Sequence, residues 1–565
     1  MSQNRLVVKF GGESGQGINT LGEILSKSVK NSGYYNFAYR EYPSLIKGGV
    51  ASYQIDISDK HINSSFRNCD ILSILDIDAI HEYIYSVREN GIIIYDALDL
   101  QLTEEEKSYI TEKNIQIVSL DTKKMALDAG GLEIMANMVL LGFIWRIMNL
   151  EMSSLEEVVR EKFQDKGIDM DAEVRCLKAG YNFSKVNDVQ KSISFQKDLS
   201  LKSIMNMTGN QAIALGAISA GCRAYYAYPM TPSTSILKFL GDTYKETGVL
   251  IKQAENEITA VQMAMGSMNM GTRAMVATSG GGFDLMSETI SCAGISETPL
   301  LIVLAQRIGP GTGVPTWTGA GDLSLAVNAG HGEFPRCVIS VSNPLDAYTV
   351  TQTAFNIAET YQIPVIVLTE KQIAESIFNV IELPIPTQIQ RGLSQGDNRY
   401  EITENGISPR WIPSEENPVY LQNSDEHKEN GDSTENSKDI IEMSDKRMRK
   451  LKTLRDNLPE PTYYGSEKPE IVFVGYGSVG NTVRDLLNEY SNIGYLHYNY
   501  IYPLKYQKLL EFKEDGIKIV FVENNQTGEF NKLVRQESGL EITDKILKYD
   551  GRPFFIDDIL DFLNK

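Results

Sequence analysis

The chain has 565 residues, with 54 basic and 74 acidic side chains and a formal net charge of −20. A chain of this length is expected to fold as several domains. The acidic balance, with no basic stripe to offset it, argues against binding to nucleic acid. Because no apolar run approaches transmembrane length and no signal peptide is recognisable, we expect a cytoplasmic protein that binds no membrane.

The cysteines stand singly along the chain, and no two of them have the C-x-x-C spacing of many metal sites. Scattered cysteines are more often buried, reduced thiols. We therefore expect neither an iron–sulfur cluster nor a zinc site within this chain. The cysteines are Cys69, Cys176, Cys222, Cys292 and Cys337.

The first segment that suggests a site is a glycine-rich turn near the N-terminus. A strand at residues 6–10 runs into this turn, which contains Gly12, Gly15 and Gly17, and a helix follows. Glycines in such a turn let backbone amides approach an anion at the helix N-terminus. Tight packing is the alternative explanation, so the turn alone is a weak indication of an anion site.

The second segment is the sequence Tyr-Pro-Met-Thr-Pro-Ser at residues 228–233, which follows an aromatic strand and precedes a helix. Pro229 biases Tyr228 away from helical geometry, and Pro232 stands where a helix can begin without losing a hydrogen bond. An ordinary hydroxyl-rich helix start is the structural alternative.

The third segment places a carboxylate at the start of a helix. A strand-like run at residues 249–251 precedes a helix with one apolar stripe. Asn256 is the expected N-cap, which puts Glu257 in the first turn, at the mouth of a β–α crossover. Open α/β sheets bind ligands at that mouth, although an acid there also suits the helix dipole. The neighbouring Glu255 is a second candidate carboxylate.

The fourth segment is a buried strand at residues 299–306 that ends in Arg307, before a loop rich in glycine and proline. A cation at the end of such a strand pairs either with a structural acid or with an anionic ligand. The planar fork of arginine suits a carboxylate better than lysine does.

In order and spacing, these last three segments resemble the α subunit of the 2-oxoacid:ferredoxin oxidoreductases. Members of this family carry Tyr-Pro-Ile-Thr-Pro-Ser, where this chain has Met230 in place of Ile. They also carry a glutamate that opens the helix after the next strand, and an arginine about fifty residues further on, as Glu257 and Arg307 stand here. Two further segments that resemble family positions are Thr278–Gly282 and His331–Arg336.

The resemblance implies oxidation of a 2-oxoacid, 2-oxoglutarate or pyruvate, with coenzyme A to acyl-CoA and carbon dioxide, while ferredoxin is reduced. Thiamine diphosphate is the implied cofactor and the electron sink for the decarboxylation. Glu257 would hold its aminopyrimidine and favour the imino tautomer, beside Tyr228 and Pro229. Arg307 and Thr231 would bind the carboxylate of the 2-oxoacid.

The first domain resembles the γ domain of the same family. The family pattern is a glycine-rich turn, a Tyr-Pro pair as at residues 42–43, and then Arg-Gly-Gly-Ser, where this chain has Lys47. The resemblance implies a γ domain fused ahead of the α region, with Gly12, Gly15 and Gly17 in a loop for CoA or another anion.

The polar segment at residues 385–465 has the composition of a disordered linker. Positions within it resemble the family, however, so we expect an ordered excursion that ends in a helix near residues 440–458.

The last domain opens with a GxGxxG at residues 475–480, which is typical of dinucleotide sites. No acidic residue ends a second strand about twenty residues further on, so the contact to a ribose is missing. The resemblance instead favours a transketolase C-terminal-like domain.

The chain lacks the Gly-Asp-Gly…Asn pattern that holds Mg²⁺ and diphosphate in thiamine enzymes. In the family this pattern and a [4Fe–4S] cluster lie on a separate β subunit, so the resemblance implies a heterodimer or a larger assembly with a shared active site. The branch favoured is that for 2-oxoglutarate or broad specificity. Alternatives are an arylpyruvate-specific oxidoreductase and a catalytically silent scaffold or regulatory subunit.

The expected fold class is α/β, with several domains. These are a Rossmann-like γ-type domain at 1–185, a linker at 186–203, a thiamine diphosphate pyrimidine-binding domain at 204–384, the excursion at 385–465 and a transketolase C-terminal-like domain at 466–565.

Overall fold

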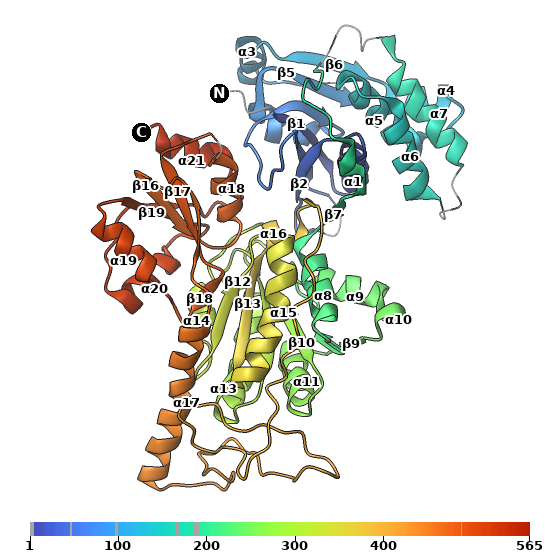
Figure 1. Ribbon diagram of the computed structural model, residues 1–565. Helices are drawn as coiled ribbons and strands as arrows, with labels where there is room; N and C mark the ends of the chain where they lie inside the picture. The colour runs from blue at the N-terminus through green and yellow to red at the C-terminus, as the bar shows by residue number, and fades with distance from the viewer. Residues whose placement is uncertain are drawn as a thin grey trace. The chain divides into compact units, whose positions relative to one another are not determined.

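The computed structural model describes residues 5–45, 48–96, 100–164, 167, 169–184, 189, 191–487 and 489–565 (Figure 1). Lys47 and residues 185–188 and 190, at the start of the expected linker, therefore lie outside the described part of the chain. The chain forms two compact units. The N-terminal unit contains residues 1–207, 376–382 and 555–565, and the central unit contains residues 208–375 and 383–554.

The N-terminal unit is built on a mixed sheet with the strand order β2-β3-β1-β4-β5-β6. Strand β1 pairs in parallel with β4 and antiparallel with β3. The strands of this sheet are β1 (Arg5–Glu13), β2 (Tyr35–Glu41), β3 (Val50–Ser58), β4 (Cys69–Ile74), β5 (Val87–Asp96) and β6 (Gln116–Leu120).

Helices pack on this sheet, and the largest hydrophobic cluster of the unit joins apolar residues of α1, α5 and α7 to those of the strands. Helix α1 buries Leu21, Leu25 and Val29, which recur at helical spacing. The helices are α1 (Ile18–Asn31), α2 (Ile77–Tyr83), α3 (Glu104–Glu112), α4 (Thr122–Asp128), α5 (Ala136–Ile147), α6 (Met152–Phe163), α7 (Met170–Tyr181) and α21 (Ile556–Leu563), with short 3₁₀ helices at Ile84–Ser86, Glu133–Met135 and Leu199–Ser203.

Two short strands, β7 (Met205–Met207) and β14 (Phe378–Val380), also belong to the N-terminal unit. They pair antiparallel with each other, and an isolated bridge joins Ala38 to Ile377. Phe37 and Phe378 stack edge to face with ring centroids 4.9 Å apart. Residues distant in sequence thus complete this unit through backbone pairing and aromatic contact.

The central unit contains a larger sheet with the strand order β18-β12-β13-β11-β10-β8-β9, parallel except for β18. Every residue of β11 and β13 is buried, as expected for parallel strands covered on both faces. The strands are β8 (Ala224–Ala227), β9 (Leu250–Gln253), β10 (Ala274–Thr278), β11 (Leu300–Gln306), β12 (Cys337–Ser340), β13 (Pro364–Glu370) and β18 (Tyr500–Tyr502).

Helices cover this sheet, and Figure 1 shows α15 running across the face that is turned to the viewer. Helix α15 begins with Pro344, directly after the N-cap Asn343, and it packs against α8. The helices are α8 (Gly209–Ser219), α9 (Thr234–Asp242), α10 (Tyr244–Thr247), α11 (Glu257–Asn269), α12 (Gly280–Asp284), α13 (Ser287–Ile295), α14 (Leu323–Asn328), α15 (Pro344–Tyr361) and α16 (Lys371–Glu375).

The C-terminal part of the central unit forms a second sheet with the order β15-β17-β16-β19-β20. Its strands are β15 (Thr462–Gly465), β16 (Ile471–Gly475), β17 (Ile493–His497), β19 (Lys518–Glu523) and β20 (Lys545–Leu547), and its helices are α18 (Val479–Leu486), α19 (Gln507–Glu514) and α20 (Glu529–Ser538).

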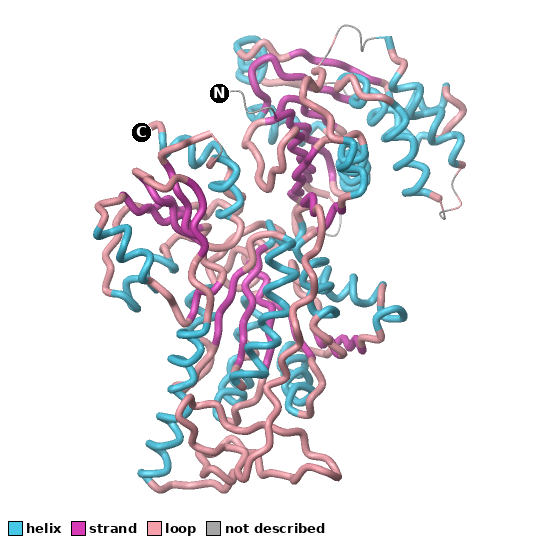
Figure 2. Tube along the Cα trace, viewed as in Figure 1, coloured by secondary structure: helices cyan, strands magenta, loops and turns pink. Residues whose placement is uncertain are grey.

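Between the two sheets the chain makes a long excursion at residues 383–436, shown as loop in Figure 2, followed by α17 (Ser437–Asn457). Buried ion pairs fix it to the sheet. The fully buried Glu359 of α15 lies 2.7 Å from Arg273, 2.9 Å from Arg391 and 3.4 Å from Arg410. These contacts explain how a polar segment packs without an apolar core, because each buried charge has a partner.

A second buried cluster holds α17. Lys446 and Lys450, both fully buried, form ion pairs with the buried Glu297. Burial opposes ionisation of Glu297, but the two ammonium groups hold the pKa of its carboxyl well below its usual range. Burial lowers the pKa of Lys450 to about 8, against the attraction of Glu297.

Replacing Glu297 by Gln is expected to lower the free energy of unfolding by about 3 kcal/mol, because two buried ammonium groups lose their counter-charge. Chemical denaturation of the full chain measures this loss. Asp242→Asn is the matched control, since Asp242 pairs with Lys238 on the exposed face of α9. Equal stability of the two variants would refute a stabilising role for the cluster.

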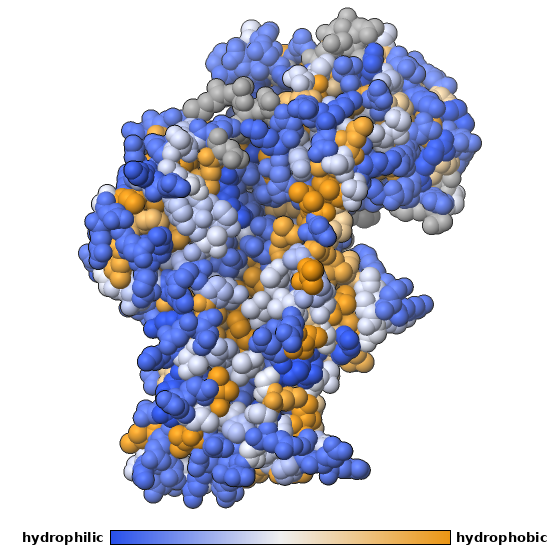
Figure 3. Space-filling view, viewed as in Figure 1, coloured by the Kyte–Doolittle hydropathy of each residue, from blue (hydrophilic) through white to orange (hydrophobic). Residues whose placement is uncertain are grey.

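On the face seen in Figure 3, hydrophilic residues predominate and apolar residues form small, separate patches. Within the described residues, no single helix is both long and apolar enough to span a membrane, and one bent pair, Thr122–Asp128 with Glu133–Ile147, passes that test by length and composition alone.

Candidate functional site

Four neighbouring strands of the central sheet place the site residues predicted from sequence. Strands β11, β10, β8 and β9 lie next to one another and are parallel, so the loops at their carboxyl ends share one edge of the sheet. Arg307 follows β11, Thr231 lies in the loop after β8, and Glu257 begins the helix after β9. Ligands of open parallel sheets bind at this edge.

Arg307 is a buried cation with few partners. Its side chain is 8% exposed, and Nη1 donates a hydrogen bond to the backbone oxygen of Thr231 at 2.7 Å. Within the described residues it forms no ion pair. Burial lowers the pKa of Arg307, whereas the charge of Asp322 raises it. A buried guanidinium with spare donors is suited to an anionic ligand.

Glu257 is the first residue of α11 and is 5% exposed. The side chain of Asn256 caps this helix by accepting a hydrogen bond from the Thr259 amide at 2.9 Å, which confirms the helix start predicted from sequence. Among the described residues, no group donates a hydrogen bond to the Glu257 carboxylate. The carboxylate is thus free to accept a hydrogen bond from a ligand.

The Glu257 carboxylate lies against Gly282 in the short helix α12. A Cβ atom at Gly282 would stand 2.1 Å from Thr278 Oγ1 and 2.6 Å from Glu257 Oε1, so any side chain there would displace these two groups. The fit of an aminopyrimidine rests on the carboxylate itself. It is buried and, among the described residues, accepts no hydrogen bond, so it can accept one from the N–H of such a ring.

The loop after β8 lies near helix α12. Met230, which replaces the family Ile, accepts a hydrogen bond at Sδ from Thr278 Oγ1 at 3.6 Å, and its methyl group would lie 3.7 Å from a Cβ at Gly281. Tyr228 is 42% exposed and Pro229 is half-buried. The structure therefore places Tyr228 and Pro229 in this loop without a recorded contact to Glu257.

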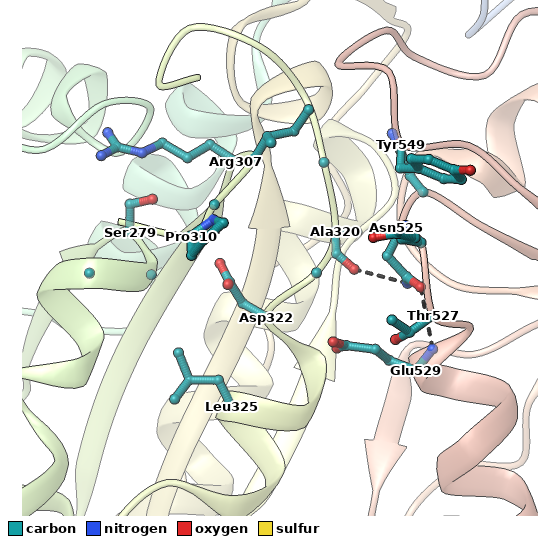
Figure 4. A pocket seen from close by; sticks show the side chains of 18 of the residues that line it. Ser279, Arg307, Pro310, Ala320, Asp322, Leu325, Asn525, Thr527, Glu529 and Tyr549 are labelled. Carbon is teal, nitrogen blue, oxygen red and sulfur yellow. Dashed lines mark hydrogen bonds between the residues drawn. The ribbon is translucent and has the colours of Figure 1, made fainter. Parts of the chain in front are cut away.

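A cavity of about 460 Å³ opens at this edge of the sheet, between the loops that follow β10, β11 and β19. Figure 4 shows Arg307, Ser279 and Asp322 on one side of it, with Asn525, Thr527 and Tyr549 opposite. The cavity is lined by Ser279, Gly280, Gly281, Asp284, Arg307, Ile308, Gly309, Pro310, Gly311, Gly319, Ala320, Gly321, Asp322, Leu325, Asn524, Asn525, Gln526, Thr527, Glu529 and Tyr549.

Arg307 is the only basic residue among those that line the cavity, and three acids accompany it: Asp284, Asp322 and Glu529. Burial and the charges of Glu529 and Asp284 raise the pKa of Asp322 to about 6, against the attraction of Arg307. Burial also raises the pKa of Glu529, although its carboxylate accepts a hydrogen bond from the Ser324 amide at 2.9 Å.

Sequence reasoning did not identify Asp322 or Glu529 as site residues. Asp322 follows Arg307 within the same glycine-rich loop, so a polar residue in that loop was the available signal. Glu529 comes from the second sheet, and nothing local in its sequence indicates that it meets Arg307.

The glycine-rich turn belongs to the N-terminal unit. Gly17 caps α1 with φ 85°, and a Cβ there would stand 2.6 Å from Asn137 Nδ2. A Cβ at Gly12 would stand 2.6 Å from Gln16 Oε1, whereas Gly15 has open space around it. Close packing against neighbouring side chains therefore explains why Gly12 and Gly17 are glycines. Binding of an anion by this loop stays a prediction.

The amides of this turn are partly engaged. The Glu13 amide donates to Gln16 Oε1 at 2.9 Å, the Ser14 amide to the Gly49 oxygen at 3.2 Å, and the Gln16 amide to the Glu13 oxygen at 3.1 Å. An anion that bound here would compete with these bonds or use the remaining amides.

The GxGxxG turn after β16 is filled by a carboxylate. Glu370 Oε1 accepts a hydrogen bond from the Ser478 amide at 2.7 Å and would stand 2.8 Å from a Cβ at Gly477. Burial raises the pKa of Glu370, against the bonds from Ser478 and Thr318. The amide that would face a dinucleotide phosphate is directed to a protein side chain.

Within the described residues, no group of three or more His, Cys, Asp or Glu side chains is arranged to hold a metal ion. The cysteines are free thiols, four of them buried and Cys292 partly exposed.

Comparisons with known proteins identify relatives along the whole chain. Residues 215–446 match the family described as pyruvate flavodoxin/ferredoxin oxidoreductase, thiamine diphosphate-binding, and residues 7–183 match pyruvate ferredoxin/flavodoxin oxidoreductase. The 2-oxoacid:ferredoxin oxidoreductase subunit alpha of Sulfolobus sp is 30% identical over 99% of this chain and 97% of its own length.

A second relative is the 2-oxoglutarate synthase subunit KorA of Methanothermobacter marburgensis, which is 31% identical over 62% of this chain and 96% of its own length. Among solved structures, 2-oxoglutarate:ferredoxin oxidoreductase from Magnetococcus marinus, with 2-oxoglutarate, coenzyme A and succinyl-CoA bound, superposes with a TM-score of 0.91. That match has 27% identity and covers 100% of this chain and 99% of the other.

Proposed function

Because the chain belongs to the family of 2-oxoacid:ferredoxin oxidoreductase α subunits, we propose that its cavity edge is one half of a thiamine diphosphate-dependent active site. The proposed reaction converts a 2-oxoacid, 2-oxoglutarate or pyruvate, and CoA to acyl-CoA and carbon dioxide, with electrons passed to ferredoxin. The observation that carries the site assignment is the buried Arg307, which has one backbone hydrogen bond and no ion pair among the described residues.

Thiamine diphosphate supplies the electron sink that decarboxylation of a 2-oxoacid needs. In this proposal, Glu257 accepts and shares a proton with the far nitrogen of the aminopyrimidine, because its carboxylate is buried and has no donor among the described residues. The absence of a side chain at Gly282 lets the carboxylate take this position, since a Cβ there would stand 2.6 Å from Glu257 Oε1. Tyr228 and Pro229 lie in the loop beside it and are proposed to flank the cofactor.

Arg307 is proposed to bind the carboxylate of the 2-oxoacid through its unused N–H donors. The hydrogen bond from Nη1 to the Thr231 backbone fixes the guanidinium at the end of β11. Thr231 would then offer its hydroxyl as a second donor to the substrate. Both residues follow parallel strands, which are rigid supports for such groups.

The family is named for subunits of an assembly, and we propose that a β subunit completes this site. That partner would hold Mg²⁺, the diphosphate and a [4Fe–4S] cluster, and would pass electrons to ferredoxin. The sequence pattern for a Mg²⁺–diphosphate site is missing from this chain, and its cysteines are scattered. An α/β heterodimer is the simplest assembly of this kind.

The division of labour along the chain is part of the same proposal. Residues 1–185 would act as a γ-type domain whose loop at Gly12, Gly15 and Gly17 binds CoA or another anion. Residues 204–384 would hold the pyrimidine, and residues 466–565 would form a transketolase C-terminal-like domain. Five free thiols suit the reducing cytoplasm, where we place the complex.

The alternative of a catalytically silent scaffold receives no support from the site. Thr231, Glu257 and Arg307 are all present, Glu257 and Arg307 are buried, and Arg307 lines the cavity. No observation favours an arylpyruvate substrate over the others.

Isolation of the chain from its native cells tests the proposal. We expect a stoichiometric partner with a Gly-Asp-Gly…Asn sequence and clustered cysteines, and turnover of a 2-oxoacid only when both chains are present. Reduction of ferredoxin by each chain alone and by the mixture is the measurement. A chain that purifies without any such partner, or a reconstituted mixture that reduces no ferredoxin, would leave the scaffold as the better explanation.

A further inference from the structure

The cavity contains polar groups that the reaction, as proposed, does not use. Ser279 is fully buried, and its hydroxyl oxygen has no hydrogen-bond partner in the described structure. Figure 4 shows this side chain close to Arg307. A buried hydroxyl without a partner and a buried guanidinium with spare donors both line this cavity, which indicates a site built for a polar, anionic ligand.

Asp322 faces the same space. Its amide donates to Gln306 Oε1 at 3.1 Å, and its Oδ2 would lie 2.9 Å from a Cβ at Gly280, next to Ser279. In Figure 4 its carboxylate points toward the side of the cavity where Arg307 and Ser279 lie. Asp322 interacts electrostatically with Arg307, and within the described residues the two side chains form no ion pair although both line the cavity.

The groups around Asp322 disfavour its negative charge. Burial, Glu529 of α20 and Asp284 of α12 raise the pKa of Asp322 to about 6, whereas Arg307 lowers it. The charge of Asp322 also helps to raise the pKa of Tyr476, and Tyr549 lines the same cavity. Burial and the neighbouring acids therefore make Asp322 easier to protonate than an ordinary aspartate.

A 2-oxoacid carboxylate on Arg307 would bring another negative charge to this group of three acids. Like charges at short range disfavour joint ionisation, so one of the acids gains a proton. Asp322 is the acid directed at Arg307, whereas Glu529 is engaged by the Ser324 amide. The geometry thus selects Asp322 as the acceptor.

We propose that Asp322 is the second anchor of the 2-oxoacid: its carboxylate takes one proton from solvent as the substrate binds Arg307, and the carboxyl group then donates a hydrogen bond to the substrate. This inference rests on the function proposed above and adds to it a residue and a linked proton. Substrate affinity then falls as pH rises above the pKa of Asp322 in the empty cavity, because the proton becomes harder to obtain.

Calorimetry tests the linked proton. The assembled α/β complex is titrated near pH 7 with oxamate, an unreactive isostere of pyruvate, in buffers of different ionisation enthalpy. Wild type is expected to take up about one proton per site on binding, and Asp322→Asn to take up none. In turnover assays, the KM of wild type rises by up to about tenfold per pH unit above pH 6, and that of Asp322→Asn stays level.

Glu529→Gln is the matched control. It removes a neighbouring charge but not the proposed acceptor, so proton uptake persists and its midpoint moves to lower pH. Uptake that survives in Asp322→Asn, or disappears in Glu529→Gln, would overturn the assignment. A complex that turns over 2-oxoacids without Asp322-linked uptake refutes this inference alone, whereas a complex that neither binds nor turns over any 2-oxoacid refutes the proposed function with it.

Discussion

Replacement of Glu257 by Gln is expected to lower turnover of the assembled enzyme by about 10²- to 10⁴-fold while the fold is preserved. Glutamine has nearly the same shape but cannot share a proton with the aminopyrimidine. The rate of hydrogen–deuterium exchange at the thiazolium carbon of bound thiamine diphosphate is the direct measurement, because it reports cofactor activation before any 2-oxoacid binds. We expect this rate to fall in parallel with turnover.

The glycines of α12 provide a matched pair of controls. Gly282→Ala puts a Cβ 2.1 Å from Thr278 Oγ1 and 2.6 Å from Glu257 Oε1, so it is expected to displace the carboxylate together with the Thr278 hydroxyl and slow the exchange. Gly281→Ala places its Cβ 3.7 Å from Met230, which is ordinary contact, and should leave the exchange rate unchanged. Loss of folding in Glu257→Gln, or exchange as fast as in wild type, would count against the assigned role.

Removal of the Arg307 side chain should raise the KM for the 2-oxoacid by about 10- to 100-fold. Replacement by Ala deletes the only basic residue among those that line the cavity, and with it a charge-assisted pair to the substrate carboxylate. Thiamine diphosphate is held elsewhere in this proposal, so its dissociation constant should stay within about twofold. Steady-state kinetics and equilibrium binding of the cofactor measure the two effects separately.

Arg307→Lys distinguishes charge from geometry. Lysine retains the positive charge but lacks the planar fork, so an intermediate KM is expected. Added guanidinium ion should partly restore the Ala variant and leave the Lys variant unchanged. A loss of cofactor affinity as large as the rise in KM would contradict the assignment of Arg307 to the substrate carboxylate. Arg307 would then support the loop at Thr231 rather than bind the substrate.

Local features of the site were predictable from the sequence. A helix start depends on residues within one turn of each other, so Asn256 could be identified as the cap that sets Glu257 in place. The position of Arg307 at the end of β11 followed in the same way from a continuous apolar run.

The acids of the cavity were not predictable in that way. Asp322 acts through neighbours on α12 and α20, and Glu529 stands more than two hundred residues beyond Arg307 in the chain. A pKa of about 6 for Asp322 arises from burial and from those neighbours together. The burial of Asp322 and its proximity to Glu529 arise only when the second sheet packs against the first.

The packing of the excursion at residues 383–436 was likewise not predictable from its local composition. Its composition is polar, and hydrophobic periodicity gives no reason for it to be ordered. Glu359 of α15 pairs with Arg391 and Arg410 of the excursion and with Arg273, which precedes β10, so each of the three guanidinium groups shares this one carboxylate. Ion pairs between residues so far apart in the chain cannot be recognised from a local sequence pattern.

The sequence by itself thus determined the family and the α/β class and proposed Thr231, Glu257 and Arg307 as site residues, because these depend on short motifs and on the spacing between them. Only the tertiary structure decided that Arg307 is buried with no ion pair among the described residues, that Glu257 lies against Gly282, and that Asp322 and Glu529 share the cavity. The physical reason is that burial, electrostatic coupling and open volume belong to groups brought together from distant segments, and no single segment carries them.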